Sequence, residues 1–321
     1  MNGLPKYLAL TGGVGGAKLA LGLARTLPPE QVAFLVNTGD DFVHYGLHVS
    51  PDLDTLMYAL ADESNPETGW GRRDESWRCI ETLRGLGGES WFNLGDRDLA
   101  VHLQRTERLR RGARLSDVTR ELNAALGTRH AVWPMTDDPM PTVVHTQEGP
   151  LAFQHYFVRE RCAPRVTCFQ FLGQADARPV PAVLDWLHDP TLAGIFLCPS
   201  NPYVSIDPIL AVPGLRDALR ACGAPIIAVS PIVAGLAIKG PTAKMMEELR
   251  VPSTALAVAE HYVGLLDGYV LDAQDAGLLG AVEALGIAAI ATPTVMLTLN
   301  DKVQLAERVC AFAQQLGRVR T

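Results

Sequence analysis

The chain has 321 residues, 48% of them hydrophobic, with a formal net charge of −7 and a sequence pI near 5.6. This length supports a large buried core, whereas the acidic balance disfavours the basic surface on which non-specific nucleic-acid binding depends. No apolar run approaches the ~20 residues that cross a bilayer, and no secretory leader pattern opens the sequence. We therefore expect a cytoplasmic protein with neither nucleic-acid nor membrane partners.

The first predicted strand, Tyr7–Leu10, runs into a glycine-rich turn. Lys18 and a helical pattern follow at once, and the pattern ends at Pro28. A turn of bare backbone that opens a helix leaves several N–H donors unpaired, and the helix dipole adds to their attraction for anions. We therefore predict a phosphate-binding loop. Its glycines are Gly12, Gly13, Gly15 and Gly16.

This turn departs from both standard phosphate-binding fingerprints. A P-loop needs adjacent Gly and Lys, but Ala17 separates Gly16 from Lys18. A dinucleotide fingerprint needs its third glycine where Lys18 stands. A tight turn that uses glycine only for its positive φ is therefore an alternative of equal weight.

Short apolar runs that end in Gly, Pro, Ser, Asn or Asp alternate with longer helical patterns, which is typical of buried parallel strands. The runs are Val32–Val36, Gly194–Cys198, Pro225–Val229, Tyr269–Leu271 and Ile287–Ile290, with a final helix over Lys302–Leu316. We predict one α/β domain over residues 1–321, with a Rossmann-like, doubly wound, mostly parallel sheet. Ligands of such sheets bind beyond the carboxyl ends of the strands, where the polar loops fall.

Two segments interrupt this alternation. Residues 62–130 are rich in Arg, Glu and Leu at helix-like spacing and predict a helical insertion. Further along, the alternating runs Thr142–Thr146 and Leu151–Val158 predict a small antiparallel β-hairpin. The insertion either walls off a ligand pocket with aromatic side chains or serves only as surface cover. The aromatic candidates are Trp70, Trp91 and Phe92.

Acidic residues gather in the loops that follow the predicted strands. Carboxylates grouped around phosphates suit Mg²⁺, which prefers oxygen ligands. Alternatively, each Asp serves only in a turn or as a helix cap, with Asp52 or Asp54 capping the helix near Thr55. The acids concerned are Asp40, Asp41, Asp52, Asp54, Asp137 and Asp138.

Arg97 stands between two acids in the run Gly95-Asp96-Arg97-Asp98. An arginine here either clamps a phosphate or stacks on a planar ring, or it merely pairs with a neighbouring Asp and fixes a turn. The histidines show no paired metal-ligand spacing, so we expect them to be packed or exposed rather than catalytic. They include His44, His48, His102, His145 and His155.

The motifs occur in a fixed order over nearly the whole chain, from about Leu8 to the final helix. They are Thr11–Lys18, Val36–Asp41, Ser50–Thr55, Leu94–Asp98, Met135–Pro139 and Pro199–Pro202, with Trp70–Glu75 and Ser230–Ile232 in further agreement. In this series the sequence resembles the 2-phospho-L-lactate transferase family, the deazaflavin-coenzyme enzymes also called CofD or FbiA. The resemblance implies an enzyme, a transferase of coenzyme F-420 biosynthesis that forms a homodimer.

The reaction implied by the resemblance joins two small molecules. The deazaflavin alcohol Fo attacks a phosphate of a guanosine-diphospho-carboxylate donor, and GMP leaves. By the same resemblance, Asp54 and Arg97 contact Fo, whereas Asp41 and Asp54 act as the catalytic acids that hold Mg²⁺. The nucleotide would lie against Gly12, Gly13, Gly15, Gly16, Lys18, Asn37, Thr38, Gly39, Ser200, Asn201 and Pro202. The sequence leaves open whether the carboxylate is lactate, enolpyruvate or glycerate.

Two other functions compete with this one. A non-enzymatic sugar-nucleotide-binding regulator of the gluconeogenesis-factor type would share the glycine loop, but it normally carries a Pro-Gly-Asp-Ile-Arg-type element in place of Pro51–Asp54. A nicotinamide-dependent dehydrogenase predicts an acid after the second strand, a place that Asp40 occupies. Phosphoryl-type transfer needs positioning and charge neutralisation rather than a covalent nucleophile, which agrees with the residues present.

Overall fold

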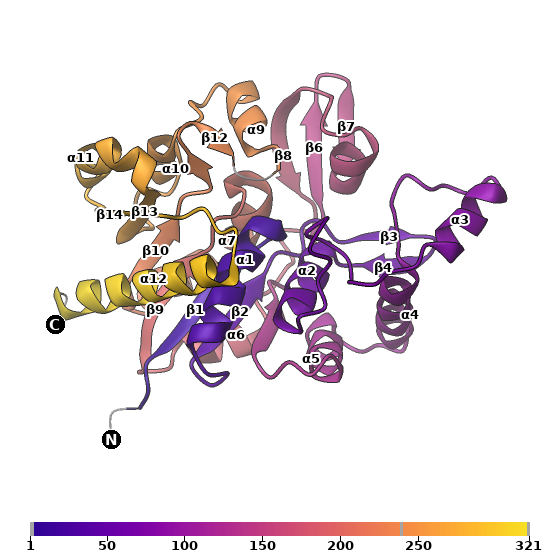
Figure 1. Cartoon of the computed structure of the whole chain (residues 1–321), viewed down its shortest axis with the longest axis horizontal. Helices are drawn as coiled ribbons and strands as arrows, with labels where there is room; N and C mark the ends of the chain where they lie inside the picture. The colour runs from indigo at the N-terminus through magenta and orange to yellow at the C-terminus, as the bar shows by residue number, and fades with distance from the viewer. Residues whose placement is uncertain (1–2, 238–239, 320–321) are drawn as a thin grey trace.

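A seven-stranded parallel sheet forms the centre of the protein in a computed structural model, which describes residues 3–237 and 240–319 (Figure 1). Its strand order is β14-β13-β10-β9-β1-β2-β5. These strands are β1 (Lys6–Thr11), β2 (Val32–Val36), β5 (Ala131–Pro134), β9 (Leu192–Leu197), β10 (Ile226–Val229), β13 (Gly268–Asp272) and β14 (Ala288–Thr292). The apolar runs predicted as parallel strands are all confirmed as members of this sheet.

Helices cover both faces of the sheet because alternate strand residues point to opposite sides. In β1, Tyr7 and Ala9 pack on one face, and Leu8 and Leu10 pack on the other. The first face is covered by α1 (Gly13–Thr26), α2 (Pro51–Leu60), α4 (Asp96–Arg110), α5 (Leu115–Ala125) and α12 (Leu299–Val319). The second is covered by α6 (Pro181–Leu187), α7 (Asp207–Ala211), α8 (Leu215–Ala221), α9 (Thr242–Glu248), α10 (Ala255–His261) and α11 (Leu279–Glu283). The doubly wound α/β fold is thereby confirmed.

The chain changes direction across the sheet between β1 and β9. From β1 it winds outward through β2 to β5, and it returns to β9 on the other side of β1 before it winds to β14. The loops that follow β1 and β9 therefore diverge, and a crevice opens between them at the carboxyl ends of the strands.

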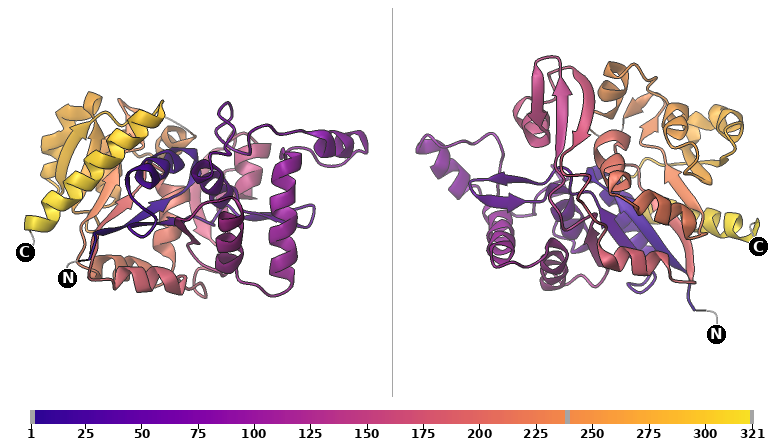
Figure 2. Two further views of the ribbon diagram at one scale, coloured as in Figure 1. Left: turned by 60° about the horizontal axis from the view of Figure 1, so that its bottom comes forward. Right: turned by 180° about the vertical axis from the view of Figure 1, so that it is seen from behind.

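The segment over residues 62–130 holds α3 (Arg78–Gly85), α4 and α5 and contains no strand of the central sheet. A short antiparallel hairpin, β3 (Phe42–His44) and β4 (Leu47–Val49), comes before it and contacts α4. Together with α3, this hairpin extends from the sheet on the side opposite the C-terminus (Figures 1 and 2).

The predicted hairpin is part of a three-stranded antiparallel sheet with the order β7-β6-β8, in which β6 is the central strand. It consists of β6 (Thr142–Thr146), β7 (Gly149–Ala152) and β8 (Val166–Phe171). The prediction of an extended run up to Val158 is wrong beyond Ala152, because the chain there turns into the π-helical turn η1 (His155–Arg159). Phe153, Tyr156 and Phe157 lie three and four residues apart, which is helical spacing, but the stretch is too short for this spacing to separate a helical turn from a strand.

Smaller elements complete the chain. They are the hairpin β11 (Ile232–Val233) and β12 (Leu236–Ala237), the π-helical turn η2 (Pro202–Ile206) and the 3₁₀ turn η3 (Ala273–Leu278). None of the described helices combines the length and the apolar composition that a membrane crossing requires.

Candidate active site

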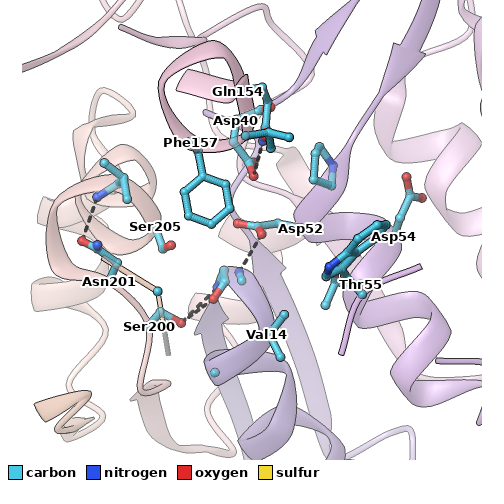
Figure 3. Close-up of a pocket in the computed structure, with 18 of the residues that line it drawn as sticks. Val14, Asp40, Asp52, Asp54, Thr55, Gln154, Phe157, Ser200, Asn201 and Ser205 are labelled. Carbon is cyan, nitrogen blue, oxygen red and sulfur yellow. Dashed lines mark hydrogen bonds between the residues drawn. The ribbon is translucent and has the colours of Figure 1, made fainter. Parts of the chain in front are cut away.

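A cavity of about 520 Å³ opens at the crevice between the loops after β1 and β9 (Figure 3). Its walls come from the glycine loop, the start of α2, one face of α4 and the loops after β2, β9 and β14. Aromatic and apolar side chains share these walls with carboxylates, as in a site for a molecule that is part planar and part charged. The aromatic lining residues, with histidine included, are Tyr58, Trp70, Phe92, His102, Phe153 and Phe157.

The glycine loop opens α1 directly at the cavity. Gly13 has a φ of 66°, which a residue with a side chain adopts only at a cost. Its N–H donates to Asp52 Oδ1 over 2.6 Å, and the N–H of Gly12 donates to Ser200 Oγ over 3.2 Å. Two donors of the helix N-terminus are thus already satisfied by side chains of the protein.

Close packing accounts for the other two glycines of this loop. A Cβ on Gly16 would lie 2.2 Å from Ser200 Oγ and 2.3 Å from Thr11 Oγ1, and one on Gly15 would lie 2.7 Å from the Pro199 carbonyl oxygen. Only glycine lets α1 approach the loop after β9 so closely. Gly15 lines the cavity, whereas Gly16 lies outside its lining.

Asn37 lies beneath the cavity and is fully buried. Its Nδ2 atom donates to Asp52 Oδ2 over 2.9 Å and lies 3.3 Å from Asp40 Oδ1, while its Oδ1 atom accepts the N–H of Gly39 over 2.8 Å. This one amide therefore orients two carboxylates. Asn37, Thr38 and Gly39 do not line the cavity themselves.

Asp40 and Asp52 face the same part of the cavity beside Phe157 (Figure 3). Burial and the adjacent charge of Asp52 raise the pKa of Asp40 well above its usual range. Burial also raises the pKa of Asp52 to about 6, although Asn37 and the Gly13 N–H donate to this carboxylate. Over the described residues no Lys or Arg forms an ion pair with either acid.

Asp54 points away from that pair, toward α4 (Figure 3). It is buried and forms a two-pronged ion pair with Arg105, whose side chain is 0% exposed; one of the two bonds joins Nη1 to Asp54 Oδ2 over 3.0 Å. His102 Nδ1 lies 3.6 Å from Asp54 Oδ2, and the Tyr58 hydroxyl donates to Asp98 Oδ1 over 2.5 Å. An internal cation thus neutralises this second acidic group.

Asp41 does not line the cavity. It accepts hydrogen bonds from Ser50 Oγ over 2.7 Å and from His48 Nε2 over 3.1 Å, and its Oδ1 atom is buried without a hydrogen-bond partner among the described residues. Burial raises the pKa of its carboxyl. The structure therefore brings Asp54 to the cavity wall but leaves Asp41 behind that wall.

Arg97 also lies outside the cavity lining. Its side chain donates to the Arg73 carbonyl oxygen over 2.7 Å and to Glu63 Oε2 over 3.0 Å, and Glu75 accepts its backbone N–H. These bonds brace the loop that carries Trp70 to the mouth of the cavity. Neither Asp96 nor Asp98 forms an ion pair with Arg97.

The remaining predicted nucleotide-binding residues fall on two sides of the cavity. Lys18 lines it and donates to the Met296 carbonyl oxygen over 2.9 Å, which ties α1 to the loop before α12. Ser200 and Asn201 line it too, and Asn201 Oδ1 accepts the N–H of Tyr203 at the start of η2 over 3.0 Å. Pro202 follows within η2 and does not line the cavity.

Comparison with known proteins agrees with this arrangement of motifs. Residues 8–284 match the family model described as 2-phospho-L-lactate transferase CofD. The chain belongs to the 2-phospho-L-lactate transferase family. It is accordingly an enzyme of the transferase class.

Relatives of this transferase match over almost their full length. The chain is 39% identical to a phosphoenolpyruvate transferase of Streptomyces griseus, over 97% of the chain and 99% of that protein. It is 35% identical to a 2-phospho-L-lactate transferase of Methanosarcina mazei, over 94% and 98%. The crystal structure of a UPF0052-family protein from Bacillus halodurans has the same fold, with a TM-score of 0.64 at 16% identity over 96% of the chain and 99% of that protein.

Sequence reasoning missed part of the transferase's site. Asp98 and His102 line the cavity, and Arg105 lies directly behind them. Their spacing of four and three residues places them on one face of α4, which is the signal that could have found them. The sequence predicts histidines that are packed or exposed rather than catalytic. His102 is packed, and it lies buried in the cavity wall in a cluster with Asp54 and Asp98.

Proposed function

We propose that this transferase acts in coenzyme F-420 biosynthesis and transfers a phospho-carboxylate group from a guanosine-diphospho donor to the deazaflavin alcohol Fo. The Fo hydroxyl oxygen bonds to the phosphorus that carries the carboxylate, the bond from that phosphorus to GMP breaks, and the hydroxyl proton is lost. The single observation that carries the proposal is the cavity, which joins a helix N-terminus to an aromatic wall at the crevice of the sheet. Its volume of about 520 Å³ suits ligands of this kind.

We assign the two substrates to different lining residues of the cavity. The glycine loop, Lys18 and Ser200 lie on the side where the start of α1 offers its positive dipole end, so we assign the guanosine diphosphate part to this side. Trp70, Phe92 and Tyr58 also line the cavity, and we assign the deazaflavin ring to the flat apolar surface that they offer. Arg97 contributes here by bracing the Trp70 loop, in addition to any contact with Fo.

We propose enolpyruvate as the carboxylate of the donor. The support is the name of several relatives at 38–40% identity, which are phosphoenolpyruvate transferases from Streptomyces and other genera. A lactyl donor is the alternative, since the relative from Methanosarcina mazei is a 2-phospho-L-lactate transferase.

We further propose that the reaction depends on Mg²⁺, which when bound neutralises charge on the phosphates. The donor set fits a hard cation, because Asp40 and Asp52 converge on one part of the cavity without an ion-pair partner among the described residues. The sequence predicted Asp41 and Asp54 for this role. Both oxygens of Asp54 are held by Arg105, and Asp41 lies behind the cavity wall. We therefore favour Asp40 and Asp52 as the ligands, and the predicted pair stays a prediction.

Incubation of the purified protein with Fo, Mg²⁺ and each of three donors tests the proposal. The donors carry enolpyruvate, lactate or glycerate, and mass spectrometry identifies the phosphodiester product and GMP. We expect product with the enolpyruvyl donor at the highest rate. Absence of product with all three donors would refute the proposed reaction.

Calorimetric titration separates the competing functions. We expect GDP with Mg²⁺ to bind, and neither NAD nor a UDP-sugar to compete with it. Tight binding of a UDP-sugar in place of GDP would favour the regulator. We also propose that the transferase is a cytoplasmic homodimer, and light scattering on the same samples tests the dimer.

A further inference from the structure

Five polar side chains form a connected set of contacts between α2 and α4. α2 contributes Asp54 and Tyr58, one helical turn apart, and α4 contributes Asp98, His102 and Arg105 on one face. All five side chains are buried, and their contacts join the two helices at the cavity wall. α4 belongs to the 62–130 segment, so this segment supplies part of the site rather than surface cover alone.

Arg105 fixes which nitrogen of His102 carries the proton. A guanidinium has donors only, and Nη1 of Arg105 lies 3.2 Å from Nδ1 of His102. Nδ1 must therefore accept, and the ring proton belongs on Nε2. His102 is 1% exposed, so water does not compete for this contact.

The Nε2 atom of His102 is left with its hydrogen and no well-aligned acceptor. It lies 3.3 Å from Asp98 Oδ2, but the two are not aligned for a hydrogen bond, and within the described parts of the chain Nε2 has no hydrogen-bond partner. A buried N–H without an acceptor is costly, so its retention in a native site calls for an explanation, which a bound ligand that supplies the acceptor would give. His102 and Asp98 both line the cavity.

We propose that His102 and Asp98 together bind a hydroxyl group of the acceptor substrate. The N–H at Nε2 donates to the hydroxyl oxygen, and Asp98 Oδ2 accepts the hydroxyl hydrogen, because Asp98 Oδ1 is already engaged by Tyr58. This inference rests on the proposed function, in which the acceptor is an alcohol with a hydroxylated side chain.

Charge selects a hydroxyl chain over a phosphate at this subsite. Two carboxylates, Asp54 and Asp98, face the position, and Arg105 is the cation that forms an ion pair within the cluster. Asp98 accepts the Tyr58 hydroxyl hydrogen at Oδ1 and keeps Oδ2 open toward the cavity, so it offers a second acceptor rather than a donor. A phosphate would be repelled here, whereas a neutral hydroxyl meets one donor and one acceptor.

Arg105 is a positioning residue in this account. It does not line the cavity, yet it holds Asp54 in place and sets the tautomer of His102. Arg105 therefore affects substrate binding by orienting His102 and does not contact the substrate itself.

Binding measurements with three variants of His102 test the proposal. We measure Kd for Fo and for GDP with Mg²⁺ by calorimetry in wild type, His102→Leu, His102→Gln and His102→Asn. His102→Leu should weaken Fo binding about tenfold and leave GDP binding unchanged, since one buried hydrogen bond is lost on the acceptor side. His102→Gln should recover most of the affinity because its amide reaches the place of Nε2, and His102→Asn should not. His145→Gln, a histidine that bonds Gln170 away from the cavity, is the matched control.

Nitrogen-15 NMR of histidine-labelled protein gives a readout that a purely structural role would not move. We expect the His102 signal, assigned by its loss in His102→Gln, to report protonated Nε2 and unprotonated Nδ1, and to shift on addition of Fo. Far-UV circular dichroism checks that each variant is folded, and the Asn variant stands in if the Leu variant is not.

The outcomes separate this inference from the function on which it rests. If wild type binds no Fo, the proposed function and this inference both fall. If wild type binds Fo and the folded His102→Leu and His102→Asn variants bind it equally well, or lose GDP binding to the same extent, only this inference falls. Protonation at Nδ1 in wild type would also overturn it.

Discussion

The two acidic groups of the cavity differ in how their charge is balanced. Asp54 and Asp98 meet Arg105 and His102 across the α2–α4 interface, and the pKa of Asp98 is lowered. Asp40 and Asp52 lie at the end of β2 and the start of α2 without such a cation, and both have raised pKa values. Asp54 thus has its counter-charge within the protein, whereas for Asp40 and Asp52 we propose that a bound cation supplies it.

This difference separates two tasks that the sequence presents as one run of aspartates. A carboxylate already paired with a buried arginine holds its geometry in the free protein and offers little charge to a metal. An unpaired, buried carboxylate pair is costly in the free protein, and binding of a divalent cation offsets that cost.

The largest effect is expected from loss of the unpaired acids. Asp40→Asn and Asp52→Asn should each lower kcat about 10³-fold and abolish Mn²⁺ binding, because the charge that retains the cation is removed. Electron paramagnetic resonance measures bound Mn²⁺, and a coupled assay of GMP release measures kcat.

Asp41→Asn and Asp54→Asn complete that experiment, and Asp176→Asn, at an exposed acid, serves as the neutral control. We expect folded Asp54→Asn and Asp41→Asn to retain Mn²⁺. The opposite result, with Mn²⁺ lost in these two variants and kept by Asp40→Asn and Asp52→Asn, would return the metal to the pair predicted from the sequence.

The next effect concerns stability rather than turnover. Arg105→Met should lower the free energy of unfolding by about 3–5 kcal/mol, since it leaves Asp54 as an unpaired buried charge. Urea denaturation measures this cost. The double variant Arg105→Met with Asp54→Leu should recover most of it, and a single variant that costs less than about 1 kcal/mol would show that water reaches Asp54.

Much of the fold could be predicted because its signals are local. The apolar runs of β1, β2, β9, β10, β13 and β14 are continuous and end in polar loops, so strand, burial and loop can be read from adjacent residues. The end of β7 could not be predicted, because a stretch as short as Phe153–Val158 does not separate a strand from a helical turn.

The parts of the candidate site that are formed by a single loop could be predicted from the sequence. The parts in which side chains from distant segments meet were harder to predict. The glycine loop was found from its own sequence and Ser200-Asn201 from the family resemblance, and both segments line the cavity. Arg105 is separated from Asp54 by 51 residues, and only the fold shows that they pair. For the same reason the sequence could not tell which aspartates are already neutralised.

A smaller effect tests the close packing that separates the glycine loop from a mere flexible turn. Gly16→Ala should cost about 1–3 kcal/mol of unfolding free energy, because its Cβ would overlap Ser200 Oγ and Thr11 Oγ1. Gly280→Ala in α11 is the matched control: a Cβ there meets nothing within 4 Å, and helix propensity predicts a slight gain. Equal stability of the two variants, measured by urea denaturation, would mean that the loop adjusts freely.

The smallest effect comes from a third kind of carboxylate at the same edge of the sheet. Asp272 is buried and accepts the N–H of Thr294 over 2.7 Å and the N–H of Gln274 over 3.0 Å. Burial alone would raise the pKa of Asp272, but these neutral donors outweigh it and lower the pKa.

Because the folded pKa of Asp272 is lowered, its stabilising effect is present above the unfolded value near ~3.9 and is lost as the pH falls through the folded value. Asp272→Asn should therefore cost about 1 kcal/mol at pH 7 and progressively less below about pH 4. Paired urea titrations of variant and wild type at several pH values measure that difference. A cost that is independent of pH would mean that the amide loses shape complementarity rather than charge, and neutral donors would then not suffice to hold an ionised acid at this edge.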